Sequence, residues 1–371
     1  MSSKSNTPYV PPGMPPLDLT GRITSFFEFW PLWLMYVPVA VWWLLLSVRY
    51  RSLTLPLIAS PAVPLSGMVG VEKSAILKLA GDKARHWILP WMIYRVTADE
   101  RQLQAETVTR ELRQAGLSLP IVGKPDIGCR GAGVKLLQNQ KELQFYLDAF
   151  PQGGLIQFQQ LSRFEAEAGV FYVRYPGSDC GEVTSLTLKY TPYVVGDGSS
   201  TLAELIKADP RAGKLQHLYV DRHWQDWERV ISKDQPFRLV FSASHCRGAV
   251  FRDGSEHIKP GLVKALDRIF DDIPNYYYGR LDIKFQNLDR LSTGRDFEII
   301  EINGASSESI NIWDRHTSLG RAIKTLLQQY STLFKLGDAN RRLGHSTPGL
   351  MALIRAWRFE SQLVKRYPKN D

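Results

Sequence analysis

Two short strand-like segments carry the side chains best suited to phosphate and metal chemistry. They read Tyr278-Gly-Arg-Leu-Asp-Ile-Lys284 and Phe297-Glu-Ile-Ile-Glu-Ile-Asn303. Side chains two positions apart on a strand share a face, so Arg280 should lie beside Asp282, and Glu301 beside Asn303. If the loop over 286–295 closes an antiparallel pair, three oxygen ligands suited to a hard cation meet a guanidinium. Either strand alone would be an ordinary sheet strand with a solvated polar face, but the two together favour a metal and phosphate site.

A glycine-rich segment precedes these strands in the chain. It reads Gly123-Lys-Pro-Asp-Ile-Gly-Cys-Arg-Gly-Ala-Gly-Val134. Glycines let main-chain amides approach phosphate oxygens closely, and Lys124 would add positive charge. The glycine spacing fits neither a Walker loop nor a dinucleotide fingerprint, and the loop leads into a strand instead of a helix. Taken alone, such a segment is more often a turn than a nucleotide site.

In this order, the motifs resemble the ATP-grasp superfamily, specifically its carboxylate-amine ligase branch, which includes D-alanine:D-alanine ligase. The resemblance covers about 89–334, and the stretch at 194–205 is similar to cyanophycin-synthetase-like members. It implies an α/β fold built from α+β lobes, with ATP and Mg2+ as cofactors. The residues that match the family's site are Lys124 for the nucleotide phosphates, the loop glycines Gly128, Gly131 and Gly133, Arg280 for the transferring phosphoryl group, and Asp282, Glu301 and Asn303 for magnesium.

Weaker matches extend this ATP site. Lys83 resembles an earlier ATP-facing lysine of the family, and Lys189 resembles another phosphate contact, although an isolated lysine is usually a solvated surface residue. Where many relatives carry an acidic pair near adenine and ribose, this chain has Gln157-Phe-Gln-Gln160, and Glu165 is the nearest carboxylate. After Asn303 the chain lacks the Pro-Gly of D-alanine:D-alanine ligases, which argues against D-alanine as substrate.

Three further residues are candidates for substrate recognition: His245, Arg247 and Glu308. Arg247 could pair a substrate carboxylate through two hydrogen bonds, whereas a lone histidine such as His245 is more often structural. The resemblance implies a ligase that activates a carboxylate as an acyl-phosphate and joins it to an amine. The alternatives are an ATP-grasp phosphotransferase and a non-catalytic nucleotide-binding membrane protein.

An uncharged apolar run from Phe29 to Val48 has the length of a membrane-spanning helix and carries tryptophans towards both ends. A buried core helix is the alternative. Arg49 and Arg51 follow the run, which favours a catalytic domain on the cytosolic side of the inner membrane, with a single-pass or monotopic anchor. We therefore expect a flexible tail over 1–25, a transmembrane helix over 26–51, an N-terminal lobe over 52–118, an ATP-grasp domain over 119–336, and a basic helical tail over 337–371.

Net charge and composition limit the kinds of partner that the chain can have. The net charge of +9 suits anionic lipid or a polyphosphate ligand, and no nucleic-acid-binding motif accompanies it, so we expect membrane lipid and no nucleic acid as partners. The three cysteines lack metal-ligand spacing, which indicates neither a zinc site nor a disulfide framework. The basic helix expected at 350–367 could lie on anionic lipid or dock on the catalytic body.

Overall fold

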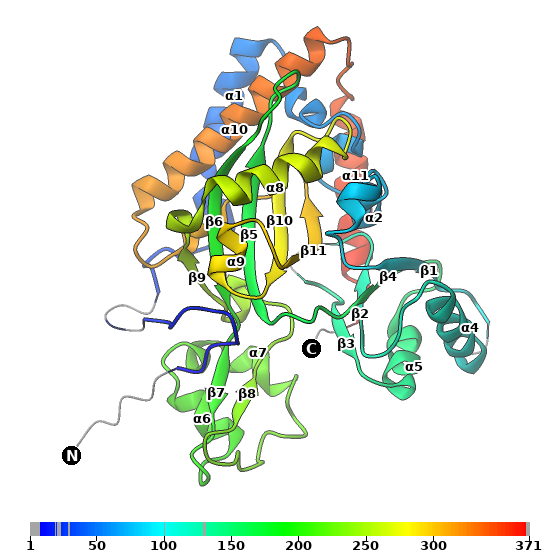
Figure 1. Cartoon of the computed structure of the whole chain (residues 1–371), viewed down its shortest axis with the longest axis vertical. Coiled ribbons are helices and arrows are strands. Elements are labelled where there is room, and N and C mark those ends of the chain that lie inside the picture. The colour runs from blue at the N-terminus through cyan, green and yellow to red at the C-terminus, as the bar shows by residue number, and fades with distance from the viewer. Residues whose placement is uncertain are drawn as a thin grey trace.

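A five-stranded antiparallel sheet forms the centre of the molecule. The computed structural model describes residues 8–18, 20, 24–28, 30–99, 101–128 and 131–368. In the sheet, the strands stand in the order β11-β10-β5-β6-β9, and Figure 1 shows helix α8 (Pro260–Asp271) lying across one face. The strands are β5 (Ala166–Val173), β6 (Glu182–Tyr190), β9 (Val250–Asp253), β10 (Tyr278–Phe285) and β11 (Phe297–Asn303).

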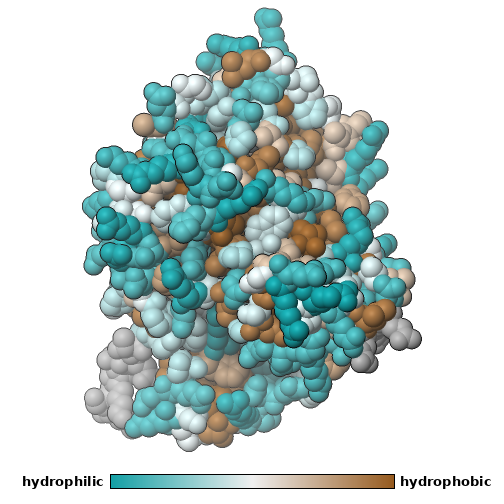
Figure 2. Space-filling view, turned by 45° about the vertical axis from the view of Figure 1, so that its right-hand side comes forward, coloured by the Kyte–Doolittle hydropathy of each residue, from teal (hydrophilic) through white to brown (hydrophobic). Residues whose placement is uncertain are grey.

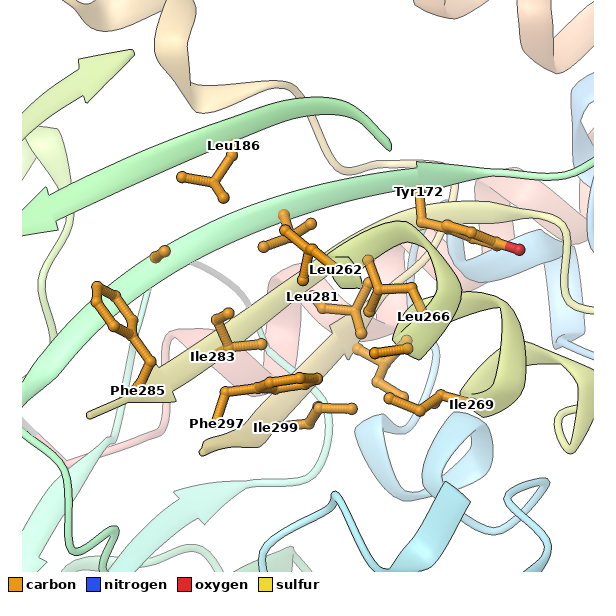
Figure 3. Packing of buried hydrophobic residues seen from close by; sticks show 14 of the residues in the cluster. Tyr172, Leu186, Leu262, Leu266, Ile269, Leu281, Ile283, Phe285, Phe297 and Ile299 are labelled. Carbon is orange, nitrogen blue, oxygen red and sulfur yellow. The ribbon is translucent and has the colours of Figure 1, made fainter. Parts of the chain in front are cut away.

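The main core lies between this sheet and α8. Leu262, Leu266 and Ile269 recur along one side of the helix and meet Leu281 and Ile283 of β10, as Figure 3 shows. Because successive strand residues point to opposite faces, the packing of these residues directs the intervening polar residues of β10 to the other face. The core therefore fixes which side of the sheet can carry polar chemistry.

A four-stranded antiparallel sheet forms a second lobe, at the lower right of Figure 1. Its strands stand in the order β1-β4-β2-β3, and two helices, α4 (Arg101–Gln114) and α5 (Gln140–Ala149), cover one face. The strands are β1 (Trp91–Arg95), β2 (Ile121–Pro125), β3 (Lys135–Leu137) and β4 (Leu155–Gln160). A smaller lobe below the central sheet contains β7 (Tyr193–Val195), α6 (Leu202–Ala208), α7 (Gln216–Val220) and β8 (Pro236–Arg238).

Helix α1 (Leu32–Tyr50) packs along α10 (Leu319–Arg342) at the top of Figure 1. Its buried Met35 and Val39 join a cluster with Leu326, and Trp42 Nε1 donates a hydrogen bond to Ser331 Oγ at 2.8 Å. Within the described residues, α1 is the one helix long and apolar enough to cross a membrane, and 17% of its 18-residue apolar window is buried. Core helices and signal sequences meet the same criterion of length and composition.

Three short helices connect these parts: α2 (Lys73–Leu77), α3 (Asp82–Arg85) and α9 (Leu288–Ser292). The C-terminal helix is α11 (Leu350–Val364). Figure 2, which brings the side of α2 and α11 forward, shows mostly hydrophilic residues with apolar ones among them. Residues 8–18 belong to the expected flexible tail, yet they contact the body, where Met14 is buried and Tyr190 Oη donates to the carbonyl of Pro15 at 3.2 Å.

The mixed α/β fold with antiparallel sheets is confirmed. Apolar residues that recur on one face at 259–272 and 318–334 predict helices, and these are α8 and α10, of which α10 continues to Arg342. The pair Thr97 and Glu100 has the spacing of a capping box and predicts a helix after it, which is α4, beginning at Arg101. Glu100 lies outside the described residues, whereas the capping box of Thr201 and Glu204 forms at the start of α6.

Candidate active site

The two strands singled out above lie side by side. β10 and β11 pair antiparallel, with Arg280 opposite Asn303 and Asp282 opposite Glu301. Arg280 Nη2 and Asn303 Nδ2 donate hydrogen bonds to Asp282 Oδ2, at 3.2 and 3.1 Å. All four side chains line a cleft of about 650 Å³. The predicted meeting of a guanidinium with three oxygen-bearing side chains is therefore confirmed as geometry.

A β-bulge gives this pair of strands its functional face. The register shifts after Asp282, so that Glu301 faces Asp282 while Ile299 faces Ile283, leaving Ile300 as the extra residue. Without the bulge, Glu301 and Ile299 would share a face, because they are two positions apart. With it, Ile299 enters the core and Glu301 lines the cleft. A bulge that re-aims a side chain is common beside active sites.

Lys124, at the end of β2, connects the second lobe to this strand pair. Its Nζ donates to the carbonyl of the bulged Ile300 at 2.9 Å and to Gln159 Oε1 at 2.8 Å. The side chain is 7% exposed, and burial lowers the pKa of Lys124 to about 8. Gln157, opposite Lys124 in the register, is fully buried, and neither polar atom of its amide has a hydrogen-bond partner in the described part of the chain.

Lys189, on β6, belongs to a buried network of charges that extends from Asp282. Its Nζ lies 3.4 Å from Asp282 Oδ1 and forms an ion pair with Glu167, which also pairs with Lys284 at 2.8 Å. Burial would raise the pKa of Glu167, but the two lysines outweigh it and lower that pKa to about 2. Burial opposes ionisation of Asp282 too, and there Arg280 and Lys189 hold the pKa below its usual value.

Glu167 and Lys73 are the site's neighbours that the motifs did not indicate. Lys73, at the start of α2, lines the cleft, lies 3.8 Å from Glu301 Oε1 and donates to the carbonyl of Gly128 at 2.5 Å. No strand or glycine motif surrounds Lys73 in the sequence, so its position beside Glu301 could be found only from the tertiary structure. Glu167 lies on β5, which pairs with β10, and it is two positions from Gly169, the residue opposite Asp282. Strand periodicity could therefore have placed Glu167 on the same face as Asp282.

The glycine-rich loop lies at the edge of the cleft, and Cys129 and Arg130 fall outside the described residues. Gly131 has a φ of +71°, and a Cβ there would lie 2.6 Å from Ser242 Oγ, so both conformation and space favour glycine. Arg247 Nη1 donates to the carbonyl of Gly131 at 3.3 Å. Arg247 therefore contacts the loop from outside the set of cleft-lining residues.

The other end of the cleft is aromatic and contains Glu308. Tyr36 Oη donates to Glu308 Oε2 at 2.6 Å, and Trp313 Nε1 donates to Glu308 Oε1 at 2.9 Å. The ring of His245 stacks on Trp313 with a centroid distance of 4.5 Å. The main-chain carbonyl of Glu308 accepts a hydrogen bond from Arg280 Nη1 at 3.1 Å, which joins the two ends of the cleft.

Besides Arg247, three residues expected at the site do not line the cleft. Lys83 is exposed on α3, and Glu165 contributes its main-chain carbonyl to Lys284 Nζ at 3.1 Å. At Gly133, a Cβ would lie 2.7 Å from Pro125 Cγ. Lys83 and Glu165 are isolated positions without a surrounding motif, so their sequence neighbours do not fix where they lie relative to the cleft.

The oxygen ligands fit a magnesium ion bound together with phosphate. Among the described residues, no group of three or more His, Cys, Asp or Glu side chains could hold a metal by protein ligands alone. Asp282 and Glu301 supply two carboxylates and Asn303 an amide, and Mg2+ in phosphate sites is usually held by one or two carboxylates plus the phosphates. The buried Nε of Arg280 has no hydrogen-bond partner among the described residues.

No family model matches the chain, and no curated protein matches it. Solved structures that resemble it include a bifunctional glutathione synthetase from Pasteurella multocida, with 16% identity over 69% of this chain and 36% of that one, at a TM-score of 0.34. The D-Ala:D-Ser ligase VanG from Enterococcus faecalis is 10% identical over 74% and 64% of the chains, with a TM-score of 0.40. A D-alanine–D-alanine ligase from Bacillus anthracis, complexed with ATP, is 10% identical over 76% and 72%, with a TM-score of 0.41.

This chain thus spans about a third of the glutathione synthetase and just under two thirds of the D-Ala:D-Ser ligase. All three TM-scores are below 0.5, so the function proposed below rests on this chain's own residues. These solved structures are named as synthetases and ligases, the class of enzyme that the sequence motifs also resemble.

Proposed function

We propose that the chain is an ATP- and magnesium-dependent ligase that activates a carboxylate as an acyl-phosphate and joins it to an amine. The observation that supports this is one cleft in which Lys124, Lys189 and Arg280 surround Asp282 and Glu301 beside a glycine-rich loop. Cations at this density attract phosphate groups, and oxygen ligands among them suit a magnesium ion bound to those phosphates.

In the proposed reaction, a carboxylate oxygen attacks the γ-phosphorus of ATP, the bond to the bridging oxygen breaks, and ADP leaves. The amine nitrogen then attacks the acyl carbon, the carbon–oxygen bond to phosphate breaks, and inorganic phosphate leaves as the nitrogen loses a proton. Lys124 and Lys189 bind and orient the phosphates, and the loop with Gly128 and Gly131 excludes water. Arg280 stabilises the charge on the transferring group.

Asp282, Glu301 and Asn303 would hold the magnesium ion, which supplies neutralisation of phosphate charge. Incubating the full-length protein with ATP, Mg2+ and a membrane extract, and following phosphate release together with product masses, tests the reaction. A new amide accompanied by ADP and phosphate supports the ligase. Stoichiometric ADP with a phosphorylated product, and no amide, would contradict it.

We also propose that α1 places the enzyme on a membrane as a monotopic protein. One side of α1 packs on α10, while a stripe on the other side exposes Trp33, Leu34, Val37, Val41, Leu44, Leu45 and Val48. The partner helix carries Arg321 and Arg342, which are 69% and 79% exposed, and a helix pair with such charges suits an interface more than a hydrocarbon core. Arg49 and Arg51, exposed at the end of α1, complement anionic lipid.

A further inference from the structure

The aromatic end of the cleft is built in part by α1, the same helix that carries the exposed apolar stripe. Trp30 precedes α1 and Tyr36 lies in its second turn, and both line the cleft. Trp33 is three positions before Tyr36, so the two side chains are neighbours on the helix surface. Trp33 is 68% exposed and begins the stripe. The apolar stripe therefore starts at the rim of the cleft.

The carboxylate at this end of the cleft has no cation in direct contact among the described residues, although Arg280 interacts with it electrostatically. Glu308 accepts its hydrogen bonds from a phenol and an indole, which are neutral donors, and it forms no salt bridge with a described lysine or arginine. Glu28, the other carboxylate nearby, is buried in an ion pair with Arg211. A ligand that complements a carboxylate held by two neutral donors is a cation.

The rings around Glu308 favour the same kind of ligand. His245 and Trp313 are stacked, and Trp30 and Tyr36 complete the wall with Phe251. Aromatic rings bind apolar chains and attract ammonium groups through their faces. Because the carbonyl of Glu308 is bound to Arg280, an ammonium group at Glu308 would stand beside the phosphate end of the cleft.

We infer that this end of the cleft binds the amine substrate, and that this substrate is an amphipathic primary amine presented from a lipid surface. Its ammonium group pairs with Glu308, which takes one proton before the attack and so frees the lone pair of the nitrogen. The second proton leaves with the departing phosphate after the carbon–nitrogen bond has formed. Its apolar chain passes Trp30 and Tyr36 and continues along the stripe of α1. The inference rests on the proposed ligase, for which it names the class of amine.

Binding of three probes to the full-length protein tests the inference without knowledge of the carboxylate. Dodecylamine, dodecanol and propylamine separate the contribution of the charge from that of the chain. We expect dodecylamine to bind at least about tenfold more tightly than either of the others, since a charge-assisted contact contributes about 1.5 to 3 kcal/mol. Equal binding of dodecylamine and dodecanol would overturn the role of the ammonium group.

Three variants assign the preferences to residues. Glu308→Gln should remove the preference for amine over alcohol, whereas Glu308→Asp should keep part of it; Trp30→Ala should remove the preference for the long chain. Glu256→Gln and Trp224→Ala are matched controls, because these residues are exposed outside the cleft, and both preferences should survive in them. Loss of amine preference in Glu256→Gln as well would show non-specific adsorption and overturn the site.

Two further measurements distinguish an amine presented from lipid from a dissolved amine, and failure of this inference from failure of the proposed ligase. Dodecylamine carried in phosphatidylcholine vesicles should bind more tightly than the same amine free in detergent solution; the reverse order would overturn presentation from lipid. Binding of Mg-ATP is measured in every sample. Retained ATP binding without amine preference rejects the inference alone, and amine preference without ATP binding rejects the proposed ligase alone.

Discussion

Asp282 holds together the buried charges of the site. It contacts Arg280, Lys189 and Asn303, and Glu167 balances a second lysine next to them. Removing one partner of such a buried network costs on the order of 3 to 5 kcal/mol, because a charge is left without compensation. Loss of activity in an Asp282 variant would therefore combine lost chemistry with lost stability.

Glu301 is the better residue for testing the metal assignment. Its side chain is 26% exposed, and its ion pair with Lys73 is 3.8 Å long. We expect Glu301→Gln to remain folded and to lose about a hundredfold or more in ATP-dependent turnover, the usual cost of removing a group that stabilises transition-state charge. Glu298→Gln, on the same strand but outside the cleft, is the matched control. Equal activity in the two variants would reject Glu301 as a magnesium ligand.

The lowered pKa of Lys124 predicts how ATP binding changes with pH. The ammonium form binds phosphate, and with a pKa of about 8 this form predominates below pH 8 and is lost above it. We therefore expect the KM for ATP to rise between about pH 7.5 and 9 in the wild-type protein. In Lys124→Arg, where the charge persists, the KM should stay flat over that range. A rise of the same size in Lys124→Arg would assign the titration to another group.

Among the elements, β11 shows which part of the site the sequence could predict. The alternation in Glu301-Ile-Asn303 and the matching Arg280-Leu-Asp282 predicted the pairing and the shared face, because strand periodicity is a local property. The bulge at Ile300 could not be predicted in this way, since it depends on how Ile299 packs under α8 and on the bond from Lys124. Several helices follow from local patterns, whereas pairing between distant segments does not: β1 pairs with β4 across the boundary expected between 118 and 119.

Helix α1 illustrates the same limit. Its length and apolar content predicted a membrane span, and these are properties of the segment alone. Its inner side, however, packs on α10 through Met35, Val39 and Trp42. Pairing of two helices distant in sequence cannot be predicted from the hydropathy of one of them. The hydropathy of the segment alone does not distinguish a spanning helix, an in-plane helix and a helix of the core.

The C-terminal helix α11 contacts the segments that surround the phosphate end of the cleft. Glu360 accepts a hydrogen bond from the amide of Gly70 at 2.6 Å, and Tyr367 Oη donates to the carbonyl of Ile127 at 2.7 Å, next to the glycine-rich loop. The ring of Tyr367 stacks on Phe150 with a centroid distance of 5.1 Å. These contacts favour the interpretation of the tail as a helix docked on the catalytic body.

Tyr367→Phe should therefore weaken ATP binding while leaving the fold intact. The ring contacts remain, but the hydrogen bond that fixes the loop is lost, and one such bond contributes about 1 kcal/mol. We expect the KM for ATP to rise about fivefold with little change in thermal stability. Tyr277→Phe removes a comparable hydroxyl bond, to Asn275, away from the cleft and serves as the control. An unchanged KM in Tyr367→Phe would show that the hydroxyl bond of Tyr367 does not contribute to ATP binding.

At the scale of the whole molecule, the stripe on α1 and the mouth of the cleft lie on one side of the catalytic body, because both include residues of α1. Contact between the stripe and a bilayer would thus place the aromatic end of the cleft next to the lipid. Helix α11 also exposes the apolar side chains of Met351, Trp357 and Phe359. The contributions of α1 and α11 can be separated by substitution, since the two helices are far apart in the sequence.

Membrane binding through α1 can be tested with the pair Leu44 and Leu45, which are 60% and 56% exposed in the middle of the stripe. Burying a leucine in an apolar environment contributes about 1.5 to 3 kcal/mol, and a carboxylate in its place opposes insertion. We expect Leu44→Glu with Leu45→Glu to lower binding to anionic vesicles by more than about tenfold, and wild-type binding to persist in high salt. Leu103→Glu, the same change at a leucine 54% exposed on α4, should bind like the wild type. If removal of residues 349–371 abolished binding while the double variant kept it, the membrane surface would be α11 and not α1.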